Sequence, residues 1–160
     1  MQSVQIIFNI FRQRPAEAFL AAAQRQHVSV IARVPLASGL LSGKKKPTTV
    51  FQPDDHRNYN RNGEAFDVGE TFSGVDYETG LKAVDELRLW VPPNVSMAQC
   101  ALRWILMFEA VTSVIPGSRR VEQVEENIRA GNLPPLSDAA MEAMRGIYDR
   151  HIRALVHQRW

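Results

Sequence analysis

The sequence predicts an α/β fold with a parallel sheet, because strand patterns and helix patterns alternate along its 160 residues. Residues 4–11 form an apolar run with β-branched and aromatic side chains, which is typical of a strand buried on both faces. An alanine-rich helix over 16–26 and a second strand over 28–32 follow at once. Strand, helix and strand within about 30 residues make a βαβ unit, whose two strands should be parallel.

The rest of the chain is expected to add helices with clear start and stop signals, and one more strand. Pro92 and Pro93 end the first helix, and Ser96 with Gln99 forms a capping box for the next. A third, short strand is expected at 113–115. The expected helices cover residues 76–91, 97–109, 120–130 and 138–150.

The helix expected over 120–130 carries an apolar stripe at helical spacing. Val121, Val124 and Ile128 lie on one face of such a helix. We expect this face to pack inward against the core.

Residues 44–74 carry no periodic pattern and are expected to form a long loop. The stretch 54–63 is polar and rich in turn residues. A loop of this length inside a compact domain is usually functional or disordered. This one follows the C-terminal end of a strand, which is where α/β folds keep their binding sites.

Composition excludes several classes of protein. The net charge of +2 gives no argument for nucleic acid, and no apolar run reaches the ~18 residues of a membrane span. A single cysteine, Cys100, excludes an intrachain disulfide and a cysteine-based zinc cluster. Residues 1–3 lack the basic region of a signal peptide. We therefore expect a cytoplasmic protein without a metal site.

The turn between the third strand and the following helix has the composition of an anion site. Pro116 ends the strand, and Gly117 lets the backbone approach something bulky. Ser118 is a candidate N-cap, and Arg119 and Arg120 lie beside the helix start, whose N–H groups attract anions. The alternative is an ordinary strand-to-helix turn with solvated arginines.

Three motifs together resemble the aldo/keto reductase family. They are residues 4–5 (VQ) with 8–11 (FNIF), residues 30–44 (VIARVPLASGLLSGK), and residues 114–117 (VIPG) with Glu122-Gln123 and Glu126-Asn127. Their order and spacing are similar to the C-terminal half of that family. The resemblance implies that residues 1–160 are part of a (βα)8 TIM barrel, with about three parallel strands (strands 6 to 8) and flanking helices.

The family reduces aldehydes and ketones with NADPH, so the resemblance implies a nicotinamide-binding region. Gln5 matches the glutamine that bonds the nicotinamide carboxamide. Arg33 stands where an aromatic residue often stacks on the ring, although a guanidinium plane can also stack. The resemblance places the pyrophosphate along Val34, Pro35, Leu36, Ala37 and Ser38, with Lys44 nearby.

The adenosine end of the cofactor is implied for the third motif. Gly117, Ser118 and Arg119 match the turn that receives the phosphates, and Gln123, Glu126 and Asn127 match residues that contact the adenine end. Arg119 or Arg120 on a 2′-phosphate would favour NADPH over NADH through charge-assisted hydrogen bonds.

The family's catalytic Asp, Tyr, Lys and His belong to the first half of the barrel, so no catalytic residue is expected in this chain. A (βα)8 barrel needs roughly 250 residues, and three strands cannot close on themselves. We expect a truncated product, or a half that assembles with the missing N-terminal half or with a second copy, where the carbonyl substrate would bind. The alternatives are a non-catalytic NADPH-sensing or interaction module, since some family members are channel-associated subunits, and a nonfunctional fragment.

Overall fold

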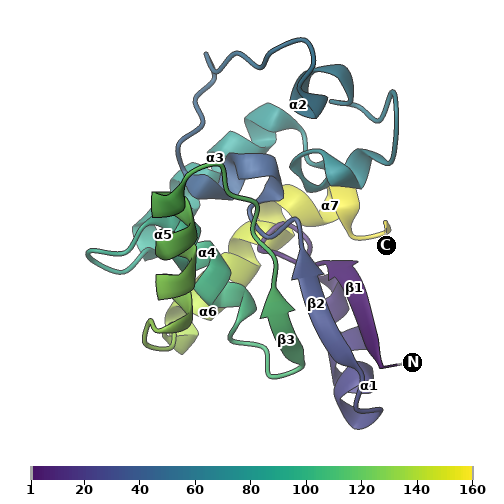
Figure 1. Cartoon of the computed structure of the whole chain (residues 1–160), viewed down its shortest axis with the longest axis vertical. Helices are drawn as coiled ribbons and strands as arrows, with labels where there is room; N and C mark the ends of the chain where they lie inside the picture. The colour runs from purple at the N-terminus through teal and green to yellow at the C-terminus, as the bar shows by residue number, and fades with distance from the viewer. Residues whose placement is uncertain (1, 160) are drawn as a thin grey trace.

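A computed structural model describes residues 2–159 and is built around a three-stranded parallel sheet. The strands are β1 (Ser3–Ile7), β2 (Ser29–Arg33) and β3 (Val111–Val114), in the spatial order β1-β2-β3 (Figure 1). Both pairs are parallel, so all three strands end at the same edge of the sheet. The predicted α/β class with three parallel strands is confirmed, and the arrangement is that of a partial (βα)8 barrel.

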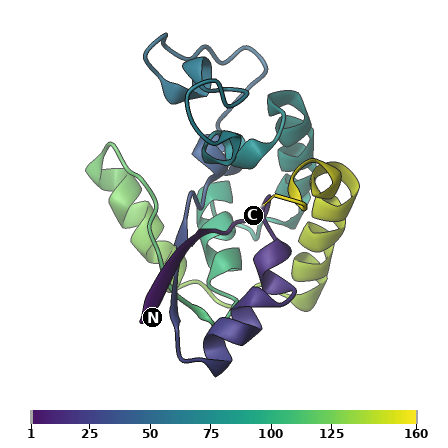
Figure 2. The same cartoon turned by 90° about the vertical axis from the view of Figure 1, so that its right-hand side faces the viewer.

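Helices connect the strands and cover one side of the sheet. In Figure 2, α1 and α6 lie on one side of the sheet, and in Figure 1 α5 lies beyond its β3 edge. The α-helices are α1 (Phe19–Arg25), α2 (His56–Tyr59), α3 (Tyr77–Leu87), α4 (Met97–Ile105), α5 (Val121–Gly131), α6 (Asp138–Ile147) and α7 (Arg153–Val156). Short 3-10 turns span Arg14–Ala16, Ala37–Ser42, Val68–Glu70, Phe72–Gly74 and Arg88–Trp90, and a π-helical turn, Tyr148–Ile152, joins α6 to α7.

The two faces of the sheet have different environments. Val30 and Ala32 of β2 are fully buried in the core beneath the helices. Alternate positions point to the opposite face. There, Gln5, Ile31 and Ser113 lie in register across the three strands, and Gln5 and Ser113 are exposed. Parallel sheets occur almost only with both faces covered, so this face is suited to contact another layer of protein.

The first strand is shorter than the apolar run that predicted it. β1 ends at Ile7, and the rest of the run leaves the sheet as a buried connection in which Phe8 and Phe11 are inaccessible to solvent. In this connection the side chain of Asn9 bonds backbone groups that have no partner strand. Its Nδ2 donates to the Val34 carbonyl at 2.8 Å, and its Oδ1 accepts from the Phe11 N–H at 2.8 Å. Residues 8–11 are buried without being part of the strand, and only residues 3–7 pair with the neighbouring strand.

The expectation that the apolar stripe of 120–130 faces the core is wrong. Val121, Val124 and Ile128 are 70%, 46% and 66% exposed. α5 instead turns its opposite side toward α4, so that Ala130 is buried and the Gln99 Nε2 donates to the Glu126 carbonyl at 3.3 Å. Periodicity identified the stripe, but it could not tell what would cover it.

Candidate functional site

A cleft of about 1000 Å³ opens at the carboxyl ends of β2 and β3. Its walls come from the loop after β2, from the segment 44–74, and from the turn that leads into α5. Figures 1 and 2 show the segment 44–74, in blue to teal, above the ends of the strands. Parallel α/β sheets keep their ligand sites at this edge, because loops from several strands converge there.

The loop after β2 holds several residues in the left-handed region of backbone space. Val34, Ala37 and Ser38 have φ values of 51°, 47° and 52°. Such conformations cost roughly 1–2 kcal/mol for each residue other than glycine, so neighbouring contacts must hold them. The Ser38 hydroxyl donates to the Glu70 carbonyl and accepts from the Phe72 N–H, both at 3.0 Å. The floor of the cleft is therefore fixed in shape by the protein itself.

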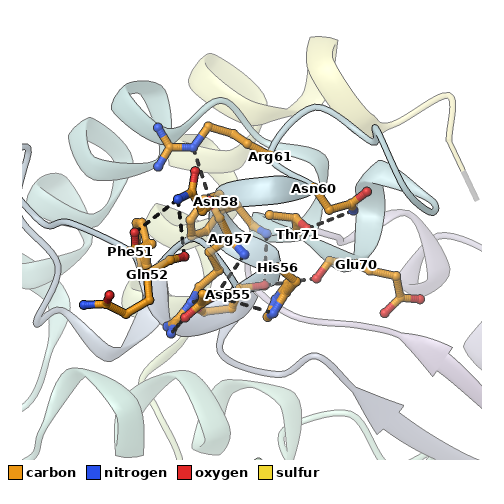
Figure 3. A network of polar contacts seen from close by, with 12 residues as sticks. Phe51, Gln52, Asp55, His56, Arg57, Asn58, Asn60, Arg61, Glu70 and Thr71 are labelled. Atoms are coloured by element: carbon orange, nitrogen blue, oxygen red, sulfur yellow. Dashed lines mark hydrogen bonds and ion pairs between the residues drawn. The ribbon is translucent and has the colours of Figure 1, made fainter.

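The segment 44–74 is ordered and contains α2 and two 3-10 turns, whereas its sequence predicted a loop without elements. Asp55 caps α2 and is clamped by Arg57, whose Nε donates to Asp55 Oδ1 at 2.8 Å (Figure 3). The hydrogen bonds from Arg57 hold the pKa of the Asp55 carboxyl well below its usual range. The Arg57 guanidinium also stacks over the ring of Phe51, 4.8 Å from its centroid.

A buried asparagine fixes the second half of this segment. Asn60 is inaccessible to solvent, and its Oδ1 accepts from the N–H groups of Ala65 and Phe66 at 2.8 and 2.9 Å. Its Nδ2 donates to the Thr71 hydroxyl at 3.2 Å (Figure 3). Polar side chains rather than an apolar stripe fold this segment, which is why hydrophobic periodicity could not find its elements. Asp55 and Asp67, which both cap short helices, were the available signal.

The opposite wall is the turn that the sequence marked as an anion site. A side chain added at Gly117 would meet no protein atom within 4 Å, so this backbone is open to a ligand. Arg120, and not Ser118, is the N-cap of α5, and it makes no side-chain cap. The Ser118 hydroxyl instead accepts from Asn127 Nδ2 at 3.0 Å, and the Arg119 N–H donates to Gln123 Oε1 at 2.9 Å.

Most of the residues predicted from the sequence meet in this cleft. Ala37 is fully buried beneath it, and Ser118 and Arg120 are exposed beside it. Pattern reasoning missed the residues of the segment 44–74 that also line it. The predicted lining residues are Val34, Pro35, Leu36, Ser38, Lys44, Gly117, Arg119, Gln123, Glu126 and Asn127, and the missed ones include Lys45, Gln52, Asp55, His56 and Arg57.

Gln5 and Arg33 line a second cavity, of about 280 Å³. Both Arg33 Nη atoms bond the Glu70 carboxylate, Nη1 to Oε2 at 2.7 Å and Nη2 to Oε1, and this pairing raises the pKa of Arg33. Glu70 lines both the cleft and the second cavity. The two spaces therefore adjoin at this ion pair.

Basic and acidic side chains both line the cleft. The basic ones are Lys44, Lys45, Arg57 and Arg119, and the acidic ones are Asp54, Asp55, Glu70 and Glu126. Burial lowers the pKa of Lys45, and the nearby charge of Arg57 lowers it further. An anion bound beside Lys45 would offset the repulsion that Arg57 and Arg119 exert on it. Among residues 2–159 no group of three or more His, Cys, Asp or Glu side chains could hold a metal ion.

The geometry defines a partial barrel with a cleft of dinucleotide size at the ends of its strands, and comparison with known proteins agrees with it. The profile of the aldo/keto reductase family matches residues 1–149. The chain therefore belongs to the aldo/keto reductase family. Within the described part of the chain, no helix has the length and apolar character to cross a membrane.

The relatives named here are longer than this chain. It is 30% identical over 154 residues to the uncharacterized oxidoreductase YqkF of Bacillus subtilis, which covers 93% of this chain and 45% of that protein. It is 24% identical over 152 residues to the Schizosaccharomyces pombe aldo-keto reductase yakc, named with NADP(+), which covers 93% of this chain and 42% of that protein.

A solved structure gives the same relation in three dimensions. The glycerol dehydrogenase AKR11B4 from Gluconobacter oxydans superposes with a TM-score of 0.73 at 26% identity, covering 94% of this chain and 43% of that chain. The chain thus spans less than half the length of the proteins that it matches.

Proposed function

We propose that this chain is the C-terminal half, residues 1–160, of a cytoplasmic aldo/keto reductase domain and supplies its NADPH site. In the complete barrel the reaction is the reduction of aldehydes or ketones. The observation that carries the proposal is that Glu70 lines both the large cleft and the cavity of Gln5 and Arg33, so the two spaces adjoin. Their volumes fall in or near the range of ~300–1,000 Å³ that ligand pockets occupy, and together they suit a dinucleotide.

The residues present fit the groups of such a cofactor. The nicotinamide would lie between Gln5 and the guanidinium plane of Arg33. Both Nη atoms of Arg33 donate to the Glu70 carboxylate, which fixes the orientation of this plane. The pyrophosphate would follow the preset loop of residues 34–38 toward Lys44. When bound, the reduced nicotinamide would supply a hydride to a carbonyl carbon.

The adenosine end would lie against the open backbone of Gly117. Gln123 and Asn127 are held in place by their bonds to the turn, and Glu126 by the bond to its carbonyl. Arg119 and Arg120 are exposed beside this wall and are free to reach a 2′-phosphate through charge-assisted hydrogen bonds.

Reduction also requires a proton donor, and we propose that it comes from the other half of the barrel. The uncovered sheet face, the edges of β1 and β3 and the exposed stripe of α5 all support such a partner, which is either the N-terminal half or a second copy of this chain. The part of the substrate pocket that surrounds the carbonyl group would be complete only in that barrel.

The cofactor proposal is tested by titrating the chain with NADPH and with NADH and following the fluorescence of the reduced nicotinamide. Replacing Arg119 and Arg120 together by Gln should weaken NADPH binding about tenfold or more, because charged hydrogen bonds contribute about 1.5–3 kcal/mol each. The double variant should also show a smaller preference for NADPH over NADH. Arg129→Gln is the matched control, since Arg129 lies on the same helix and pairs with Glu125.

The outcomes separate the alternatives. An unchanged NADPH preference in the double variant would contradict the assignment of the 2′-phosphate. Binding without turnover of common aldehydes is expected for the chain alone, and saturable turnover would contradict the proposed absence of a proton donor. Binding with a defined protein partner and still no turnover would favour a sensing module. Absence of binding in a folded chain would favour a nonfunctional fragment.

A further inference from the structure

Four arginines converge on the second cavity, which gives it a charge that a nicotinamide ring does not need. Arg12, Arg14, Arg33 and Arg159 line it, against only two carboxylates, Asp67 and Glu70. Four positive and two negative groups leave a formal excess of two positive charges around about 280 Å³. A cavity lined by an excess of one sign of charge attracts ions of the other sign.

Arg12 is the most confined of these arginines. It is 7% exposed, and its Nη1 donates to the Ser73 carbonyl at 3.2 Å. Gly69 and Gly74 leave room for its guanidinium, since a side chain at Gly69 would lie 3.3 Å from Nη1. Burial lowers the pKa of Arg12, the nearby charge of Asp67 opposes this effect, and the charge of Arg159 adds to it. An anion bound between Arg12 and Arg159 would reduce the repulsion between these two guanidinium groups.

The two carboxylates can balance only two of the four arginine charges, and both already accept hydrogen bonds. Glu70 uses both oxygens on Arg33, and Asp67 Oδ1 accepts from the Gly69 N–H at 2.7 Å. Arg14 donates from Nη1 to the His157 carbonyl at 3.0 Å. This bond leaves further N–H donors on its guanidinium, which has five.

We propose that this cavity binds an anionic group, a carboxylate or a phosphate, that is carried by the carbonyl substrate. Arg12, Arg14 and Arg159 would hold the anion, because a guanidinium matches the two oxygens of such groups. Ile6, Ile7 and Pro15 would contact the carbon chain that joins the anion to the carbonyl. The substrate assignment rests on the proposed function, because Gln5 and Arg33 share this cavity.

The size of the cavity limits the substrate. About 280 Å³ lies at the lower end of the range for small-molecule sites, and part of it would be taken by the nicotinamide. A short aldehyde or ketone with one anionic end therefore fits this space.

The experiment is calorimetric titration of the whole chain, with and without saturating NADPH. The three probes are succinic semialdehyde, which carries a carboxylate, inorganic phosphate, and butyraldehyde, which is neutral and of similar length. We expect one of the two anionic probes to bind and butyraldehyde not to bind. The anionic probe that binds identifies the group. Arg159→Gln should weaken that binding about tenfold, with a smaller loss in Arg159→Lys.

Variants at the two spaces distinguish the two proposals. Arg14→Gln is a second test of the anion site. Arg119→Gln, in the cleft, should weaken NADPH and leave the anionic probe unaffected, whereas Arg159→Gln should do the opposite. Circular dichroism establishes that each variant is folded.

Three results would overturn the anion site: equal binding of the neutral aldehyde, loss of anion binding in Arg119→Gln alone, or no binding of either anionic probe while NADPH still binds. Anion binding without NADPH binding would support the site and contradict the proposed cofactor.

Discussion

Helices α4 and α5 lie side by side, and both are amphipathic, but only α4 hides its apolar face. On α4, Cys100, Trp104 and Ile105 are at most 1% exposed. On α5 the stripe of Val121, Val124 and Ile128 faces outward, and only Ala130 is buried. The two apolar faces differ in burial because different elements surround them, although both helices have an amphipathic sequence. α4 packs into the core beneath the sheet, while α5 lies beyond the β3 edge (Figure 1).

The comparison teaches that an apolar stripe at helical spacing is buried only where neighbouring elements cover it. α4 contributes to the stability of this chain, whereas under the proposed function α5 would present its stripe to the other half of the barrel. Substitutions on the two helices should therefore have very different costs.

The largest effect is expected at Trp104. Its ring contacts Phe8 and Phe108, with centroids 5.2 and 4.9 Å away, and it is 1% exposed. Trp104→Ala should lower the free energy of unfolding by about 3–5 kcal/mol, since it removes a buried aromatic ring and leaves a cavity. Urea denaturation followed by circular dichroism measures this change. Trp90→Ala, at a 40% exposed position, is the control and should cost much less.

An intermediate effect is expected at the start of α4. The Ser96 hydroxyl accepts from the Gln99 N–H at 3.1 Å, and the Gln99 side chain returns a bond to the Ser96 N–H. Ser96→Ala should lower the free energy of unfolding by about 1 kcal/mol. Ser118→Ala, near the start of α5, is the matched control and should have little effect because Ser118 caps no helix. Equal losses in the two variants would mean that α5 is capped in solution.

The smallest effect on stability is expected on the stripe of α5. Ile128→Ser replaces a side chain that is 66% exposed and should change the free energy of unfolding by less than about 0.5 kcal/mol. The same variant should weaken assembly with a partner half or a second copy, measured by sedimentation velocity at several concentrations. A stability loss above about 1 kcal/mol in the monomer would show that the stripe packs within the chain after all.

Local sequence patterns predicted some segments correctly and others only in part. The capping box at Ser96 predicted the start of α4 correctly, because the two residues that form it are local. The run at 4–11 was predicted as a strand buried on both faces, but the strand ends at Ile7 and Gln5 on its second face is exposed. The fully buried part, residues 8–11, is a connection held by Asn9, which is as apolar as a strand. The segment 44–74 gave no helical signal, because Asp55 and Asn60 fold it through polar bonds to distant backbone groups.

The sequence by itself determined the α/β class and the order of the three strands along the chain. It also predicted many of the residues that line the cleft, since these features follow from local periodicity and from motifs. Only the tertiary structure decided that α5 presents its apolar stripe to solvent, that Arg33 pairs with Glu70, and that four arginines share one cavity. Arg12 and Arg159 lie 147 positions apart, and their proximity depends on how the chain returns to the sheet. Such contacts arise from packing between distant segments, which no local pattern encodes.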